Sequence, residues 1–243
     1  MRAMCFAGRV TKEIIRDPVN LVFGLGFPVL LLLLLSAIQA NIPVSIFEIE
    51  SLAPGMTIFA MSFMTLFSAQ ILAKDRESTF LQRLYATPMK AVDFILGYTL
   101  PLLPLALLQS LACFLAAIPL GLPVKWNILT AVLASVPAAL FFVGLGLLFG
   151  SILNPKQAGG ICGALVTNVT AIFSGIWFDL SLAGGFFEKL GDAMPFLHAV
   201  KIERAVYAGS HINLWLHLAV VAAYAAGILL LAVFLFLRQM RRN

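Results

Sequence analysis

The segment KDRESTFLQRLYATPMK, residues 74–90, concentrates charge in a chain that is 61% hydrophobic and only 11% charged. Thr79 and Gln82 have the spacing of a capping box, in which each side chain bonds the other residue's backbone N–H, so a helix is predicted to begin at Thr79. Pro88 disfavours helix at the residue before it and ends this helix. Its predicted apolar face is made by Phe80, Leu81, Leu84 and Tyr85.

A short amphipathic helix of this kind lies along a membrane surface or docks in a groove of a soluble partner. Asp75 and Glu77 precede it and Lys90 follows it, a charge order that suits the helix dipole. Glu77 also lies beside the apolar face. The segment therefore predicts an exposed element with binding chemistry rather than covalent chemistry.

A second group of candidate residues lies inside apolar segments. Hydroxyl and amide groups there either bond a neighbouring helix, the commoner role, or line a polar path. Phenylalanines spaced by four residues form a stripe that faces lipid or the core more often than a ligand. The polar group is Thr167, Asn168, Thr170 and Ser174, and the stripe is Phe59, Phe63 and Phe67.

Several kinds of chemistry are not indicated. The sequence contains no GxxxxGK[ST] loop for nucleotide phosphates. The nearest carboxylate to an apolar span interior is Asp93, at a span edge, which argues against a proton- or ion-coupled carrier. The three histidines lack a compact metal-ligand spacing, and the three cysteines imply no disulfide framework.

The elements that carry these residues are long apolar segments, each near the roughly 20 residues that a bilayer requires. Lipid offers the backbone no hydrogen-bond partner, so each is predicted to be a helix, and the fold class is an all-α integral membrane protein. The six expected spans are Val19–Ala40, Ala53–Ala73, Val92–Leu120, Ile128–Gly150, Ala158–Phe178 and Leu214–Leu237.

An even number of spans puts both termini on one side of the membrane. If that side is the cytoplasm, twelve of the 16 bases are cytoplasmic, as the positive-inside rule requires. The tryptophans Trp126, Trp177 and Trp215 then fall at the outer ends of spans, where amphipathic rings are favoured.

The remaining segments complete one transmembrane domain, residues 1–243. Residues 1–18 are predicted to form an amphipathic interfacial helix that ends at Asp17-Pro18, and residues 74–91 the cytoplasmic loop. Residues 179–213 are too apolar for a free loop and predict short outer-face helices, one running from Pro195 to about Ala208. The GxxxG patterns at Gly146 and Gly159 are expected to pack helices closely.

The cytoplasmic loop resembles the signature loop of the ABC type-2 transporter permeases, the membrane subunits of one class of ATP-driven exporters. Ser174-Gly175 and the outer-segment residues agree with the family as well. The family often has Gly at position 78, Lys at 98 and Pro at 179, where this chain has Ser, Tyr and Asp, so the subfamily stays open. The resemblance is carried by Arg76-Glu77-Ser78-Thr79, Arg83-Leu84, Pro88, Gly97, Pro195, His198 and Arg204.

The resemblance implies that the loop is a coupling helix held in a cleft of a separate ABC ATP-binding subunit. Two copies of that subunit would bind ATP and Mg²⁺, and this chain would bind no cofactor and catalyse no reaction. Two membrane subunits would meet at spans one and five, with a homodimer favoured over a heterodimer. The implied coupling residues are Glu77, Thr79, Phe80, Leu81, Arg83, Leu84, Tyr85 and Pro88.

A shared translocation path would then run past Thr167, Asn168, Thr170 and Ser174, with Phe59 and Phe63 as further candidates. The expected protein is a multi-pass permease of a bacterial or archaeal cell membrane that exports an amphipathic or lipid-like molecule and binds no nucleic acid. The alternatives are a carrier or channel working without ATP, and a membrane-embedded lipid-modifying enzyme using His198, Glu203 and Arg204. The residues do not identify the substrate.

Overall fold

The computed structural model describes residues 2–43, 45–78, 80–81, 89–210 and 212–240, and these form helices and connections without a strand. Five of the helical segments are long and apolar enough to cross a membrane. The prediction of an all-helical membrane protein is therefore confirmed. The five segments are α2 (Pro18–Gln39), α3 (Ile49–Glu77), α5 (Ala91–Ala117) with the 3-10 turn η1 (Ile118–Leu120), α6 (Asn127–Ala134) with α7 (Val136–Ile152), and α12 (Leu214–Met240).

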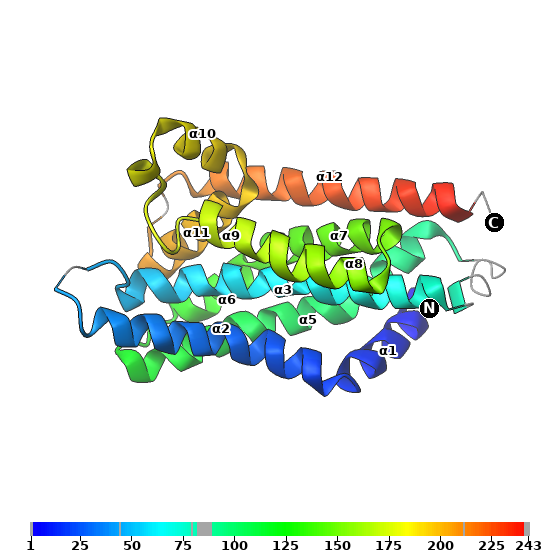
Figure 1. Ribbon diagram of the computed structural model, residues 1–243, viewed down its shortest axis with the longest axis horizontal. Coiled ribbons are helices and arrows are strands. Elements are labelled where there is room, and N and C mark those ends of the chain that lie inside the picture. Colours follow the sequence, from blue (N-terminus) through cyan, green and yellow to red (C-terminus); the bar gives the residue numbers. More distant parts are fainter. Residues whose placement is uncertain (1, 44, 79, 82–88, 211, 241–243) are drawn as a thin grey trace.

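The helices run along one long axis, and the two ends of the bundle differ (Figure 1). We call the end that holds Glu77 and Arg238 the inner end, following the predicted orientation, and the opposite end the outer end. The first helix, α1 (Arg2–Ile15), lies at the inner end together with the end of α12. The short helices that precede α12 lie at the outer end.

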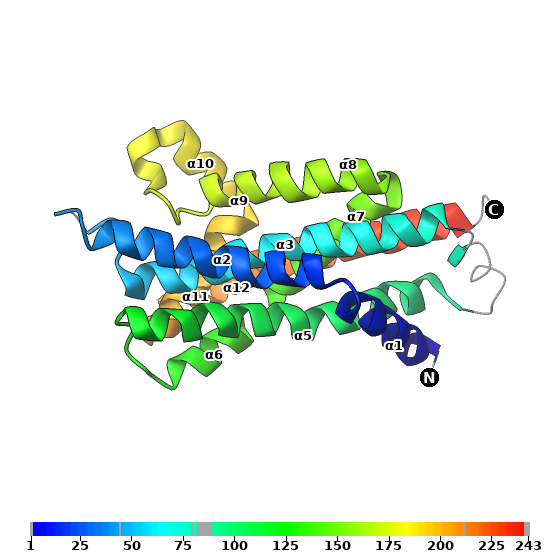
Figure 2. The same cartoon turned by 60° about the horizontal axis from the view of Figure 1, so that its bottom comes forward.

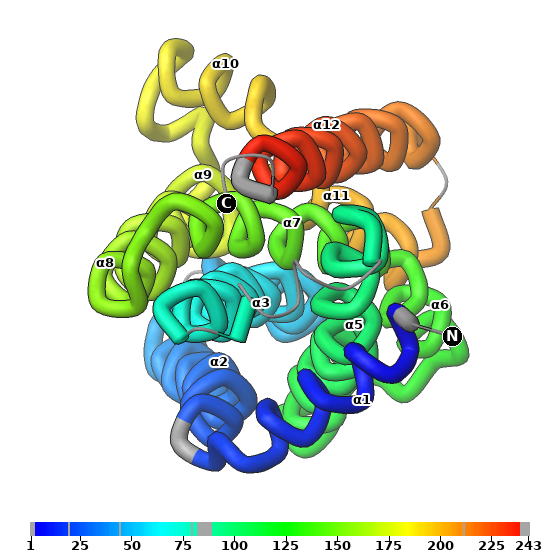
Figure 3. Tube along the Cα trace, turned by 90° about the vertical axis from the view of Figure 1, so that its right-hand side faces the viewer, coloured from blue at the N-terminus to red at the C-terminus, as the bar shows by residue number. Residues whose placement is uncertain are grey.

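Helix α3 is the centre of the bundle, as the view from the inner end shows (Figure 3). In the most apolar 18-residue stretch of α3, 83% of the residues are buried, whereas the corresponding stretches of α2 and α12 are 22% buried. Helix α7 packs closely on α3 because Gly146 and Gly150 leave room for its backbone, as their GxxxG spacing predicts. The hydroxyls of Thr65 and Ser68 cross this contact and donate to the carbonyls of Phe142 and Val143.

The segment expected as the fifth span is helical but not uniform. It consists of α8 (Pro155–Gly160), a π-helical turn η2 (Ile161–Val166) and α9 (Thr167–Phe173), which lie against α3 (Figure 2). The helix ends at Phe173 rather than at the expected Phe178. Gly175, with a φ of +68°, turns the chain there in the left-handed conformation that commonly ends helices.

A proline and a glycine each lie at a break between helical segments. The expected fourth span is two helices that meet at Ser135, with Pro137 in the first turn of α7. At the outer end, Gly184 has a φ of +97° and separates the 3-10 turn η3 (Leu180–Ala183) from α10 (Gly185–Ala193). Helix α11 (Pro195–Ala208) begins and ends as predicted.

Helix α1 ends just before Asp17, whose carboxylate accepts a hydrogen bond from the backbone of Asn20 and caps α2. Its apolar face is used for packing within the protein, because Phe6 and Val10 are buried and the helix lies against α5. Met4 and Ile15 of the same helix are apolar but exposed. The amphipathic pattern thus predicts the helix, and the fold decides which apolar residues it buries.

Candidate functional site

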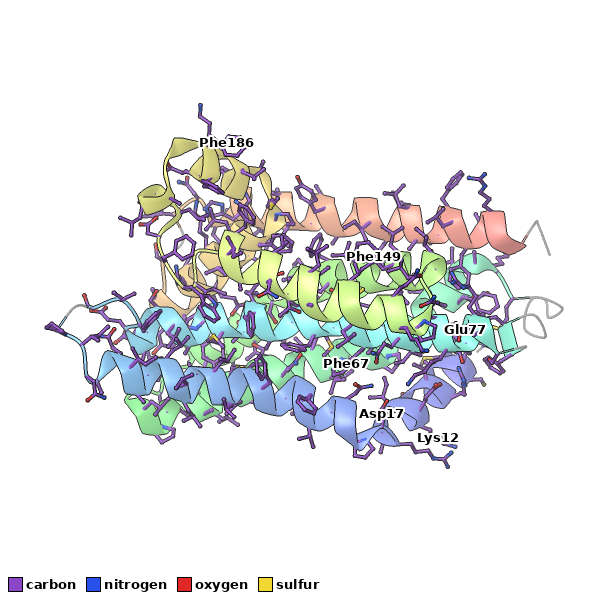
Figure 4. All side chains as sticks on the ribbon, in the orientation of Figure 1. Lys12, Asp17, Phe67, Glu77, Phe149 and Phe186 are labelled. Carbon is purple, nitrogen blue, oxygen red and sulfur yellow. The ribbon has the colours of Figure 1, made fainter. Side chains whose placement is uncertain are left out.

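The predicted coupling segment begins where α3 ends. Helix α3 continues four residues beyond the expected end of its span, so Glu77 is its last residue and lies exposed at the inner end (Figure 4). Phe80 and Leu81 are helical, and Leu81 is buried. The other predicted coupling residues, Thr79, Arg83, Leu84, Tyr85 and Pro88, lie outside the described residues, as does the predicted capping box.

Phe80 is held by the first helix of the chain. Its ring stacks on Phe6 with 6.4 Å between the ring centroids. The Arg9 guanidinium also lies over the Phe80 ring, 4.1 Å from its centroid, in cation–π geometry. The amino-terminal helix therefore makes direct contact with the segment that is predicted to meet a partner.

Arg9 also pairs with a buried carboxylate in α3. Its two terminal nitrogens reach the two oxygens of Asp75, with 2.6 Å between Nη2 and Oδ1. The Asp75 side chain is almost fully buried, whereas Arg9 is 37% exposed. A bidentate guanidinium–carboxylate pair fixes orientation as well as distance, so it sets the position of α1 relative to the end of α3.

A third helix joins this pair through Tyr98 of α5. The Tyr98 hydroxyl donates to Oδ2 of Asp75 at 2.7 Å. Phe6 packs edge-on against the Tyr98 ring at 4.9 Å, and the adjacent Gly97 leaves the space that the Phe6 ring occupies. We call Phe6, Arg9, Asp75, Phe80 and Tyr98 the inner latch, because they connect α1, α3, α5 and the coupling segment.

Arg76 makes a separate connection from the end of α3 to α7. Its guanidinium donates to the carbonyls of Ser151, Ile152 and Leu153, the last at 2.8 Å. These carbonyls lie at the carboxyl end of α7, where helical hydrogen bonds run out and a cation is favourable. Two charged side chains next to each other in α3 thus contact different helices.

Sequence reasoning did not single out Arg9, Asp75 or Tyr98 as site residues. A signal was present at Tyr98, where the resembled family often has Lys, since both side chains can donate to a carboxylate. Asp75 was counted only in the charge pattern of the loop. Its buried location follows from the packing of α1, whose contact residue Arg9 is 66 positions away in the chain.

The polar residues proposed for a path lie on α9 and just after it. Thr167, Thr170 and Ser174 are buried, and each hydroxyl donates to a carbonyl of its own helical segment, those of Cys162, Val166 and Ala171. Asn168 is exposed and donates to the carbonyl of Ala164. Of these four side chains, Asn168 is the one that a molecule outside this chain can reach.

Phe59 and Phe63 lie in the core rather than on the surface of α3. Their rings pack edge-on with 5.9 Å between centroids, and Phe27 of α2 contacts Phe63 at 5.7 Å. Phe67, near the middle of α3 (Figure 4), lies where Gly24 lets α2 approach. The stripe fills the α2–α3 contact, and its predicted place on a substrate path stays a prediction.

The arrangement at the inner end can transmit a displacement. Among the described residues, no group of three or more histidine, cysteine and acidic side chains is arranged to hold a metal ion. What is present is a chain of contacts from Phe80 to Phe6 and Arg9 of α1, and from Arg9 through Asp75 to α3 and α5. The exposed carboxylate of Glu77 lies near it in the chain. This geometry suits a docking point for another protein.

Comparison with known proteins supports this interpretation. The sequence profile of a family described as ABC-2 type transporter matches residues 4–208, which is most of the chain. A search of curated proteins gives no match. The matched range contains the inner latch and the coupling segment, and it ends with the last residue of α11, before α12 begins.

Proposed function

Because the chain belongs to the ABC-2 type transporter family, we propose that it exports an amphipathic or lipid-like small molecule by alternating access. The family makes the chain a membrane-spanning permease component that works with an ABC ATPase. ATP and Mg²⁺ bind to that separate subunit, of which two copies serve two membrane chains, most simply a homodimer. The direction, the substrate class and the homodimer are our proposal.

The observation that carries the proposal is the position of Phe80. When the ATPase binds the coupling segment and moves it, Phe80 moves as well. Because the Phe80 ring contacts Phe6 and Arg9, α1 is then displaced with it. Arg9 passes this displacement to Asp75 and so to α3 and α5. Packed groups with bidentate bonds move as units, so closure of the ATPases would tilt these helices together.

We further propose six spans, with α8, η2 and α9 as the fifth. At about 1.5 Å per residue this segment is about 28 Å long, close to the roughly 30 Å hydrocarbon thickness of a bilayer. Both termini are then cytoplasmic, in the cell membrane of a bacterium or archaeon. The π-helical turn supports a functional role for this span, because such turns occur often at functional sites.

The proposed path follows the surface of α9, where Asn168 is exposed beside Thr167, Thr170 and Ser174. Exposed apolar residues on the same segment, Leu165 and Ile172, suit contact with a second membrane chain or with an apolar cargo. The buried hydroxyls stabilise this helix from within. Asn168 is therefore the residue that would present a polar side chain to a molecule on this path.

The test is reconstitution with the partner ATPase in proteoliposomes, with an NBD-labelled lysophospholipid as the transported probe. Glu77→Ala combined with Leu84→Asp is expected to weaken ATPase binding and to abolish ATP-driven transport. Glu77 is exposed, so Glu77→Ala alone should leave the melting temperature unchanged. Lys12→Gln, which changes an exposed charge of α1 at the same end, is the matched control.

Two results would contradict the proposal. If the double variant binds the ATPase and transports as the wild type does, the coupling segment is not the docking point. If the chain alone carries the probe down a gradient without ATP, a carrier or channel explains the transport instead. Phe80→Ala separates docking from transmission, since it is expected to retain ATPase binding and to lose transport.

A further inference from the structure

The outer end contains a cavity of about 660 Å³, within the size range of small-molecule binding sites. Its walls are the α2–α3 connection, the chain after α9, and helices α10 and α11. Apolar side chains form a large part of the lining, among them Phe47, Ile176, Trp177 and Leu197. None of the residues singled out for coupling or for the path of α9 lines it.

Arg204 supplies this cavity with a cation that makes no direct ion pair, and the nearby Asp179 carboxylate acts on its charge from a longer distance. Its Nε and Nη2 atoms donate to the backbone carbonyls of Ser51 and Gly175, each at 3.1 Å. Among the described residues no carboxylate lies within ion-pair distance of it, and its Nη1 donates to no protein atom. The other lining cation, Lys201, is already paired with Asp192 at 3.1 Å.

Two carboxylates of the lining also lack an ion pair among the described residues. Asp179 follows α9 and Glu188 lies on α10, and both are exposed at the cavity. The backbone N–H of Ser181 donates to Asp179 at 3.1 Å and lowers the pKa of this carboxyl, so that it is ionised at neutral pH. Apart from the Lys201–Asp192 pair, the charged groups of the lining are therefore the half-buried cation Arg204 and the exposed anions Asp179 and Glu188.

The apolar part of the lining has one polar atom in need of a partner. The indole N–H of Trp177 is buried and donates to no described atom, while its ring packs against Phe59 at 6.5 Å. A buried donor without an acceptor is unfavourable. The Trp177 side chain belongs to an apolar part of the lining that an apolar group of a ligand can contact.

We propose that this outer cavity binds a zwitterionic phosphoester, with the phosphate on Arg204 and the cationic amine between Asp179 and Glu188. A guanidinium suits phosphate because it presents several N–H donors in one plane. The carboxylates exclude a purely anionic ligand and favour an ammonium group. The proposal rests on the export function, since it names the substrate class that this outer site would accept.

The ligand can be a lipid or a free headgroup, because both carry the same charges. Binding can be measured on the permease alone in dodecyl maltoside micelles, with Trp177 fluorescence as the readout. Trp126 and Trp215 are 86% and 79% exposed, so both can be replaced by Phe to leave one reporter. The probes are lysophosphatidylcholine, phosphocholine and the anionic lysophosphatidylglycerol.

We expect lysophosphatidylcholine to shift the emission of Trp177 saturably, and Asp179→Asn with Glu188→Gln to weaken that binding about tenfold, as the loss of a charged contact implies. The same double variant should strengthen binding of lysophosphatidylglycerol. Arg204→Lys should weaken both lipids. Glu50→Gln is the matched control, because Glu50 is an exposed carboxylate at the outer end that does not line the cavity.

Equal binding of phosphocholine and lysophosphatidylcholine would assign the site to free headgroups, and weaker binding of phosphocholine would assign it to lipids. The proposal is overturned if the double acid variant binds lysophosphatidylcholine as the wild type does, or if lysophosphatidylglycerol binds the wild type equally well. Asp179 and Glu188 are exposed, so replacing them should not impair folding. The double acid variant therefore tests the site even if Arg204→Lys fails to fold. The binding measurement contains no ATPase, so its result does not depend on whether the protein transports. If the protein transports the probe but this cavity does not bind it, the cavity proposal fails and the export function is unaffected.

Discussion

Asp75 shows how one buried charge can organise the inner end. It accepts from Arg9 of α1 and Tyr98 of α5 while belonging to α3. A buried carboxylate is tolerated when it is paired and hydrogen-bonded, and both conditions are met here by residues from other helices. The Tyr98 hydroxyl thus adds a neutral donor to the charged one that Arg9 provides.

Removing the Arg9 charge should therefore be more harmful than its partial exposure suggests. We expect Arg9→Gln to lower the free energy of unfolding by about 1–3 kcal/mol, since it leaves Asp75 buried without a cation. Asp75→Asn in the same chain should restore part of that loss. Thermal unfolding measures both, and a double variant that is no more stable than Arg9→Gln would contradict the pairing.

Glu203 is the opposite case, a buried carboxyl without a partner. Neither oxygen has a hydrogen-bond partner among the described residues, and burial raises the pKa of this group well above its ordinary value. The folded state then holds a proton that the unfolded state releases. Stability is therefore greatest below the ordinary glutamate pKa and falls as the pH rises toward the raised one.

We expect the melting temperature of the wild type to fall as the pH rises above about 4.5, and Glu203→Gln to remove this part of the dependence. Glu203→Met should stabilise at every pH, because it also removes the unpaired polar atoms. Melting curves at several pH values compare the three proteins. Parallel pH profiles for wild type and Glu203→Gln would show that Glu203 is not the titrating group.

At the scale of elements, the α3–α7 contact is fixed by glycine. A Cβ on Gly150 would lie 2.6 Å from the backbone carbonyl oxygen of Ala69, which cannot move without α3. The hydroxyls of Thr65 and Ser68 depend on the same close approach to donate across the contact. Arg76, next to the last residue of α3, also donates to carbonyls at the carboxyl end of α7.

Gly150→Ala should therefore separate the helices and cost about 1–3 kcal/mol of stability, as overpacking does. Gly227→Ala in α12 is the control, because an added Cβ there meets no described atom within 4 Å. We expect this control to be neutral or slightly stabilising, since alanine favours helix. Equal effects of the two substitutions on thermal stability would refute the close-packing account.

At the scale of the whole molecule, two helical segments expose apolar side chains on the surface of the chain. Helix α2 has the exposed apolar residues Val22 and Phe23, and the α8–α9 segment has Leu165 and Ile172. Lipid can cover such residues, and so can a second copy. The family resemblance implies that two membrane chains would meet at these two spans, and we keep this seam as a prediction.

A cysteine cross-link tests that seam. In a chain with Cys5, Cys113 and Cys162 replaced by Ala, we expect Asn168→Cys to form a disulfide-linked dimer on oxidation. Ala223→Cys, exposed on α12, should not. Efficient cross-linking at position 223 with none at 168 would put the seam at α12 instead, as read by non-reducing electrophoresis.

Local sequence signals are sufficient to predict the class of protein and most of its helices. Apolar length, proline and glycine positions and the distribution of basic residues are local properties, so they predict spans, helix ends and orientation. The start of α11 at Pro195 and the breaks at Gly184 and Ser135 follow from such signals. The motif of the coupling loop likewise identifies the family without any knowledge of contacts.

Only the tertiary structure decided which side chains meet. Arg9 and Asp75 are 66 residues apart, and Arg204 reaches a carbonyl 153 residues earlier in the chain. Local spacing cannot indicate such pairs, because they depend on how α1 and α11 pack on α3. The sequence also suggested a polar path at Thr167 and Thr170, but in the structure both hydroxyls donate to carbonyls four or five residues earlier in their own helical segment.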